Sequence, residues 1–284
     1  MEVQMSTTTA ISAAEINKLR QATGAGMMDC RKALTETNGD FEAAIDWLRK
    51  QGQKVAAKRS DREAKEGVVI AKTTPDNKTG FIVLVSCETD FVSKNADFIS
   101  FAQSIADAAV ENNVKSIEEL NEVKINGSKV SDLVNDKLAS IGEKIGITRL
   151  ERVDGPYVAS YIHGKYRMGV LVGLSKEASE AGKDVAMQIA AMNPVAVDAA
   201  SVPKEAVERE RSIVVEQMKQ DPKMAGKTDE MIGKIAEGKL NAFFKEQTLL
   251  AQAFVKDAGK SVADYLKSVD SALKVTDFKR VALG

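Results

Sequence analysis

The apolar and polar positions of the first 60 residues predict a module of short helices. Ser12-Ala-Ala-Glu15 fits a capping box, and Ile16 and Leu19 form an apolar stripe before Gly24 ends the first helix. A second helix is predicted from about Met27 to Thr37. Helices of about three turns are marginal alone, so these are expected to pack on one another.

A third helix is predicted after Asp40, whose carboxylate can cap its first turn. We expect it to end at Gly52 and to bury a stripe made of Ala43, Ala44, Trp47 and Leu48. A charged connector follows at residues 54–65, and its basic run is typical of a solvated face. The first nine residues have no helical period and are expected to fray.

A hairpin followed by a helix is predicted next. Residues 67–72 and 81–86 are rich in β-branched side chains and flank a turn with Pro, Asp, Asn and Gly. The helix begins near Ala96 and carries Phe98, Phe101 and Ile105 on one face. This apolar face is expected to cover one side of the hairpin.

The same pattern recurs later in the chain. Strands are predicted at residues 156–162 and 169–174, and the helix after them carries Val185, Ile189 and Ala190. Residues 130–145 are predicted to be helical, and residues 147–153 form a strand that we expect in the second sheet. Duplicated antiparallel hairpins with covering helices indicate an α+β fold.

The segment after Pro194 has the composition of a helical hairpin. Val207, Val214 and Met218 have coiled-coil spacing in its first arm, and the second arm restores an apolar stripe beyond Pro222. Such a hairpin either projects as a coiled coil or packs on its own domain. Toward the end, residues 261–266 predict an amphipathic helix that is either a separate C-terminal module or docked on the core.

These patterns divide the chain into five segments. The expected segments are a three-helix module at 1–60, two core subdomains at 61–145 and 146–202, a helical hairpin at 203–246, and a return to the core with a C-terminal module at 247–284. The two core copies differ mainly where strand meets helix, at residues 88–95 against 176–180. Divergence at one loop of a shared scaffold indicates where a function was added.

Charge and composition exclude several functions. The 40 basic and 41 acidic residues leave a net charge of -1, so there is no general attraction to nucleic acid or to a membrane surface. The chain has no apolar run of membrane-spanning length and no signal-peptide start, so a cytoplasmic location is expected. No phosphate-binding glycine loop is present, so we expect no bound nucleotide.

Catalytic chemistry is also disfavoured. His163 is the only histidine, and Cys30 and Cys87 lie in different segments without a metal-ligand spacing. We therefore expect no catalytic residue, no metal site and no cofactor. Both cysteines are expected to be reduced and buried.

The stretch at residues 88–95 is the most informative part of the chain. It places Phe91 beside Asp90, in a connection after a buried strand. An exposed phenylalanine lacks the roughly 2 kcal/mol of stabilisation that its burial would give. Exposure of this side chain therefore favours a partner-binding role. The sequence leaves two alternatives open: Phe91 is offered to a partner, or it folds back over its own helix.

Four stretches resemble the family of bacterial translation elongation factor Ts. They are Gly24-Ala-Gly-Met-Met-Asp-Cys-Arg-Lys-Ala-Leu34, Thr89-Asp-Phe-Val92, Tyr161-Ile-His-Gly164 and Leu249-Leu-Ala-Gln-Ala-Phe-Val-Lys-Asp257. Each is short, but they occur in the family's order and run through nearly the whole chain. One departure is Met187-Gln-Ile-Ala-Ala191, where the family often has a histidine in place of glutamine.

The resemblance implies a guanine-nucleotide exchange factor, not an enzyme, that binds elongation factor Tu and promotes GDP release. It implies that the exchange loop Thr89, Asp90, Phe91 and Val92 disturbs the partner's magnesium and phosphate site. It also implies a ubiquitin-associated-like N-terminal module that contacts the partner through Met27, Met28 and Arg31. The alternative within the module is that at least one of the two methionines is core.

Further contacts are implied for Lys58, Arg59, His163 and Gly164, and self-association is expected through the helical hairpin. Without the resemblance, His163 would be a solvated turn residue. Two other functions stay open. The protein could hold elongation factor Tu as a chaperone or scaffold without accelerating release, or bind RNA weakly through residues 54–65.

Overall fold

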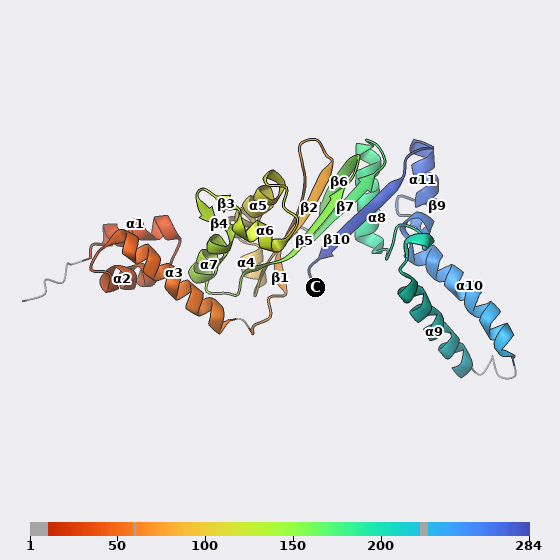
Figure 1. The fold of residues 1–284 in the computed structure, drawn as a ribbon, viewed down its shortest axis with the longest axis horizontal. Helices are drawn as coiled ribbons and strands as arrows, with labels where there is room; N and C mark the ends of the chain where they lie inside the picture. Colours follow the sequence, from red (N-terminus) through yellow and green to blue (C-terminus); the bar gives the residue numbers. More distant parts are fainter. Residues whose placement is uncertain (1–10, 60, 222–226) are drawn as a thin grey trace, which may run out of the picture. The chain divides into compact units, whose positions relative to one another are not determined.

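A computed structural model of the protein describes residues 11–59, 61–221 and 227–284, a mixture of helices and antiparallel sheets (Figure 1). The expected α+β class is therefore confirmed. The chain forms two compact units. The first contains Met1–Ile70, Val83–Leu150 and Ala282–Gly284, and the second contains Ala71–Ile82 and Glu151–Val281. The predicted fraying of residues 1–9 lies outside the described residues.

The first unit begins with the three predicted helices, α1 (Ala13–Thr23), α2 (Met27–Glu36) and α3 (Phe41–Lys58). The Ser12–Glu15 capping box forms, and Gly24 ends α1 in the left-handed conformation at φ 69°. Asp40 caps α3 by accepting a hydrogen bond from the Ala43 N–H at 2.9 Å. The shared core is made of Ile16, Leu19, Ala25, Cys30, Ala33, Leu34, Ala44 and Leu48. Ala43, predicted to be buried, is exposed.

The end predicted for α3 was wrong, because the helix continues through Gly52 to Lys58. Gly52 is buried where α3 packs against α7 (Val130–Ile141). A Cβ atom at Gly52 would lie 2.9 Å from the Cβ of Ala139. The glycine therefore serves a close helix contact and does not end the helix, since helices tolerate an interior glycine at about 1 kcal/mol.

We expect Gly52→Ala to lower the stability of the N-terminal helices by about 1 kcal/mol, because overpacking outweighs the gain in helix propensity. The fluorescence of Trp47, the only tryptophan, measures the unfolding of these helices in urea. Gly238→Ala is the matched control, since nothing lies within 4 Å of its added Cβ. An unchanged midpoint for Gly52→Ala would contradict the packing argument.

The first hairpin is formed by β1 (Glu66–Thr73) and β2 (Thr79–Cys87), and the sheet order is β1-β2-β5. The strand β5 (Gly146–Asp154) was predicted in the second sheet, and that prediction was wrong. The Gly146 carbonyl accepts a hydrogen bond from the Ser86 hydroxyl at 3.2 Å, which ties the start of β5 to β2. Its expected place in the second sheet is taken by a strand from the end of the chain.

Helices and a small ribbon complete the first unit. The helix α5 (Ala96–Glu111) buries Phe98 and Ile105, as predicted, and leaves Phe101 half-buried. It is followed by α6 (Ile117–Glu122), β3 (Lys124–Ile125) and β4 (Ser128–Lys129). The β3–β4 ribbon leads directly into α7, which ends at Gly142.

The second unit contains the second predicted hairpin, β6 (Tyr157–His163) and β7 (Met168–Leu174). The strands pair antiparallel with Tyr157 opposite Leu174, and β10 (Val275–Ala282) adds the third strand in the order β10-β7-β6. The helix α8 (Ser179–Met192) packs on β6 and β7 and buries the predicted stripe (Figure 1).

Short elements link α8 to the chain end. They are the 3-10 helices η1 (Ala199–Ser201) and η3 (Leu249–Ala251), the strands β8 (Ala253–Phe254) and β9 (Asp257–Ser261), and the helix α11 (Val262–Val269). Val262 and Leu266 of α11 belong to the core of the second unit. The predicted terminal helix is therefore docked on this core.

The helical hairpin is formed by α9 (Lys204–Gln220) and α10 (Asp229–Gln247), which form a two-helix arm (Figure 1). Val214, Met218, Ile232 and Ala236 form a small core between the two helices. Arg211 also forms an ion pair with Glu237 across them. The predicted tip near Pro222 lies outside the described residues. No helix in the described part of the chain is long and apolar enough to cross a membrane.

Candidate functional site

Phe91 is the most exposed large apolar side chain among the described residues, with 84% of its surface accessible. It lies in α4 (Asp90–Ser93), a four-residue helix that replaces the predicted open connection. The alternative in which Phe91 folds back over its own helix was wrong. We call residues 88–94 the Phe91 turn.

Thr89 is the N-cap residue of α4, and its hydroxyl group takes part in two hydrogen bonds. Its hydroxyl oxygen accepts a hydrogen bond from the Val92 N–H at 3.4 Å, which caps α4. The same hydroxyl donates to Glu143 Oε1 at 2.7 Å. Glu143 Oε2 accepts hydrogen bonds from the backbone N–H groups of Glu88 and Thr89, both at 3.1 Å. A single carboxylate from the segment after α7 therefore receives three donors from the turn.

Glu88 makes the reciprocal contact. Its Oε1 accepts hydrogen bonds from the Lys144 backbone N–H at 2.6 Å and from Arg59 Nη1 at 2.8 Å. Its Oε2 accepts from Arg62 Nη1 at 3.0 Å. The backbone bond from Lys144, with the two guanidinium groups, lowers the pKa of Glu88 to about 2. This side chain therefore stays ionised at the base of the turn.

Asp90 is engaged within the turn. Its Oδ2 lies 2.6 Å from Lys94 Nζ, one helical turn later, and this contact lowers the pKa of Asp90. The Lys94 side chain is exposed and the Asp90 side chain is partly exposed, so the ion pair contributes little stability in water. It is a contact that a partner could exchange for one of its own.

The depressed pKa of Glu88 predicts a pH-dependent contribution to stability. The pKa falls from an ordinary value of 4.5 to about 2 on folding, so the contribution is fully present above pH 4.5. It is lost as pH falls through 4.5 toward about 2, because the unfolded chain then binds the proton more readily. Urea unfolding should show Glu88→Gln less stable than the wild type near neutral pH, with a difference that shrinks over that window. A difference that stays constant with pH would contradict the assignment.

Cys87 directly precedes the Phe91 turn. Cys87 lies buried at the end of β2 and donates to the Thr89 carbonyl at 3.2 Å. Burial raises its thiol pKa to about 12, so it is not a thiolate at neutral pH. Outside the masked positions, no group of three or more His, Cys, Asp or Glu side chains is placed to hold a metal ion.

The N-terminal helices present the predicted contact residues at the start of α2. Met27 and Met28 are 53% and 72% exposed, so the alternative that one of them is core was wrong. Arg31 is exposed one turn later. Arg59 is engaged with Glu88, and the side chain of Lys58 lies outside the described residues.

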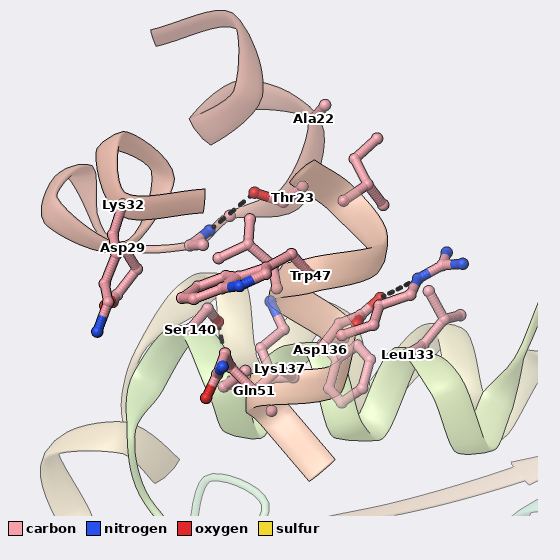
Figure 2. A pocket seen from close by; sticks show the side chains of 18 residues that line it. Ala22, Thr23, Asp29, Lys32, Trp47, Gln51, Leu133, Asp136, Lys137 and Ser140 are labelled. Carbon is pink, nitrogen blue, oxygen red and sulfur yellow. Dashed lines mark hydrogen bonds and ion pairs between the residues drawn. The ribbon is translucent and has the colours of Figure 1, made fainter. Parts of the chain in front are cut away.

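A hollow of about 490 Å³ lies between the N-terminal helices and α7, and Trp47 is among the residues that line it (Figure 2). Asp136 faces Arg49 at 3.9 Å, and burial raises the pKa of this carboxyl. Lys137 Nζ lies 5.0 Å from the ring centre of Phe101. None of the residues predicted to bind a partner lines the hollow. It therefore reflects the packing of α3 against α7.

His163 and Gly164 lie at the turn of the second hairpin, in the second unit. Gly164, Lys165 and Tyr166 all have positive φ, at 64°, 53° and 68°, which makes a tight and defined turn. His163 is exposed, and its Nδ1 lies 2.9 Å from the Tyr161 hydroxyl. The turn therefore presents an oriented ring, whether or not a partner uses it.

The stretch from Leu249 to Asp257 is fastened to α8 by buried polar groups. Gln188, at the position where the family often has histidine, donates to Gln252 Oε1 at 3.0 Å and accepts from the Val255 N–H at 2.8 Å. Asp184 accepts from Lys256 at 2.6 Å and from the Tyr265 hydroxyl at 2.8 Å. Glutamine therefore has a structural role here, and sequence reasoning did not foresee it.

Sequence reasoning also missed Glu143 and Lys144. They are 54 to 56 positions along the chain from Glu88 and Thr89, the residues of the turn to which they are hydrogen-bonded. Their immediate neighbours, Gly142 and Ile145, mark only the end of a helix. No local signal could have identified them, because their role depends on where β5 joins the sheet.

Comparison with known proteins gives one consistent result. The family model described as Elongation factor TS matches residues 88–284. The chain is 50% identical over 277 residues to Elongation factor Ts of Christiangramia forsetii, covering 96% of this chain and 99% of that protein. It is 46% identical over 277 residues to Elongation factor Ts of Flavobacterium psychrophilum, with the same coverage. Elongation factor Ts of Clostridium perfringens is 43% identical over 286 residues, covering 96% of this chain and 93% of that protein.

Proposed function

We propose that this chain, which belongs to the elongation factor Ts family, is a guanine-nucleotide exchange factor. Membership of that family makes it a translation elongation factor. In this proposal it binds elongation factor Tu, GDP-bound or nucleotide-free, and promotes GDP release. It forms and breaks no covalent bond, so it is not an enzyme in the usual sense. A factor of translation elongation acts beside ribosomes, and the proposed location is the cytoplasm.

The exposure of Phe91 carries the proposal. A phenylalanine that is 84% exposed, on a short helix anchored by two carboxylates, is unfavourable in the free protein and suited to an apolar slot on a partner. Phe91 inserts beside the magnesium site of elongation factor Tu, and Thr89, Asp90 and Val92 form the rest of the contact. Loss of the metal's bridge to the phosphates then weakens the hold on GDP.

The energetics are those of coupled binding. A nucleotide bound at nanomolar affinity is held by roughly 12 kcal/mol, and the factor must reduce this by several kcal/mol. Reciprocity requires that bound nucleotide weakens the binding of this factor by the same amount. Asp90 contributes by exchanging its ion pair with Lys94 for contacts near the partner's metal site.

The N-terminal helices supply binding away from the nucleotide. We propose a ubiquitin-associated-like module whose Met27, Met28 and Arg31 contact the GTP-binding domain of the partner. Exposed thioethers suit this role because they adapt to an irregular groove. Lys58, Arg59, His163 and Gly164 are proposed secondary contacts, and the five-segment division of the chain stays part of the proposal.

The helical hairpin is proposed to act as a coiled coil in self-association. Most of its apolar stripe packs between α9 and α10, and Ile213 and Met231 are large apolar side chains that are exposed in its described part. We expect light scattering of the complex to give a lower mass when residues 204–245 are replaced by a short linker. The same mass with and without the hairpin would contradict self-association through this segment.

The proposed function is tested by stopped-flow release of a fluorescent GDP from elongation factor Tu, with and without this protein. Acceleration at catalytic amounts of the factor is the expected result. A stable complex with an unchanged GDP release rate would mean a binding-only chaperone or scaffold. A salt-sensitive affinity for RNA in place of this binding would mean an RNA-binding protein, and the net charge of -1 gives no support to that outcome.

A further inference from the structure

We infer that Glu143 is a positioning residue for Phe91: it holds the Phe91 turn in the shape that exchange requires. This inference rests on the proposed function of Phe91. Glu143 lies outside the motif that carries Phe91 and comes from the segment between α7 and β5. Its action on a partner is indirect, through the turn.

The first argument is the number of bonds that end on one carboxylate. Glu143 accepts from the backbone N–H groups of Glu88 and Thr89 and from the Thr89 hydroxyl, at 3.1, 3.1 and 2.7 Å. Because the Thr89 hydroxyl donates its hydrogen to Glu143, its oxygen lone pairs are free to accept from the Val92 N–H. This second hydrogen bond caps α4. Glu143 therefore fixes both the backbone at the start of the turn and the orientation of the capping hydroxyl.

The second argument is reciprocity. Glu88 accepts from the backbone N–H of Lys144, while Glu143 accepts from the backbone N–H of Glu88. Each carboxylate thus fastens the other's chain segment, and the two segments cannot separate without breaking both sets of bonds. Arg59 and Arg62 also bind the Glu88 carboxylate and add the connector after α3 to the same assembly. We call Glu88 and Glu143 the carboxylate pair.

The third argument is that buried apolar packing contributes little to holding α4. A helix of four residues has too few internal bonds to be stable alone. None of its residues is buried, and Phe91 is 84% exposed, so apolar packing contributes little. A contact residue that is held in its bound conformation loses less conformational entropy on binding. The carboxylate pair supplies that restraint in the free protein.

Glu143→Gln is the most informative change because it keeps the size of the side chain. The amide has one acceptor oxygen and one donor group, so it cannot accept from both backbone N–H groups and the hydroxyl as the carboxylate does. Glu177→Gln is the matched control, since Glu177 is an exposed glutamate in the junction of the second hairpin. Both variants remove one negative charge, so a general charge effect would appear in both.

The experiment is a double-mutant cycle in the GDP release assay with Glu143→Gln and Phe91→Ala. We expect Glu143→Gln to lower kcat/KM roughly fivefold in the wild-type background and to have almost no effect when Phe91 is already alanine. The control Glu177→Gln should change neither. An equal loss in both backgrounds would mean a general structural role, and no loss in the wild-type background would also overturn the inference.

Amide hydrogen exchange in the free protein separates this inference from the proposed function. Glu143→Gln should speed exchange at the amides of Glu88, Thr89 and Val92, and Glu177→Gln should not. If Glu143→Gln left the protection of these amides from hydrogen exchange unchanged, the positioning role would be overturned, whatever the GDP release assay gives. If wild-type protein failed to accelerate GDP release, the proposed function would fail, and loss of protection in Glu143→Gln would still support the restraint on the turn.

Discussion

Replacement of Phe91 by alanine is expected to reduce the acceleration of GDP release by roughly 30-fold. Truncation of an aromatic contact at the centre of an interface typically costs about 2 kcal/mol or more, which corresponds to that factor. The free protein should lose no stability, because 84% of the Phe91 surface is already exposed. Stopped-flow release of fluorescent GDP measures the first effect, and urea unfolding measures the second.

Val195→Ala is the control for this substitution, because Val195 is an exposed apolar residue, at 53%, outside the proposed contact sites. It should leave the release rate unchanged. If Phe91→Ala matched the wild type, the insertion mechanism would be wrong even though acceleration persisted. The proposed function would then depend on the N-terminal helices.

The double substitution Met27→Ala with Met28→Ala is expected to raise KM for GDP-bound elongation factor Tu about tenfold and to change kcat little. In the proposed complex these residues bind the partner away from the nucleotide, so they are expected to contribute to the ground state and the transition state alike. A loss of about 1.4 kcal/mol for two exposed thioethers corresponds to that factor. The dependence of the release rate on partner concentration separates KM from kcat.

Met192→Ala controls for the loss of an exposed methionine, because Met192 is 47% exposed at the end of α8. It should behave as the wild type. Helix content by circular dichroism should be retained in the double variant, since neither methionine belongs to the module core. A fall in kcat with unchanged KM would mean that these side chains act on release itself and do not serve as an anchor.

Much of the fold could be predicted from local patterns. The Ser12–Glu15 box and the stop at Gly24 formed as expected, because capping and left-handed glycine depend on neighbouring residues alone. Both hairpins and their covering helices also followed from periodicity, since apolar spacing selects the face that is buried. The resemblance of four stretches to elongation factor Ts led to the same family that the comparisons establish.

The errors have a common physical origin. Gly52 has the local signature of a helix end, but a close contact with Ala139 explains why glycine is there. The strand β5 was assigned to the wrong sheet because strand pairing is a long-range choice that alternation does not encode. The exposure of Phe91 was undecided because an apolar residue in a connection is compatible with either state.

The sequence by itself determined the three N-terminal helices and their starts, the two hairpins with their covering helices, and which motif carries the phenylalanine. Those properties arise from backbone preferences and side-chain spacing within a few residues. Only the tertiary structure decided that Phe91 is exposed and that Glu143 and Glu88 hold its turn. A hydrogen bond between residues more than 50 positions apart depends on how strands and helices pack, and no local pattern specifies that geometry.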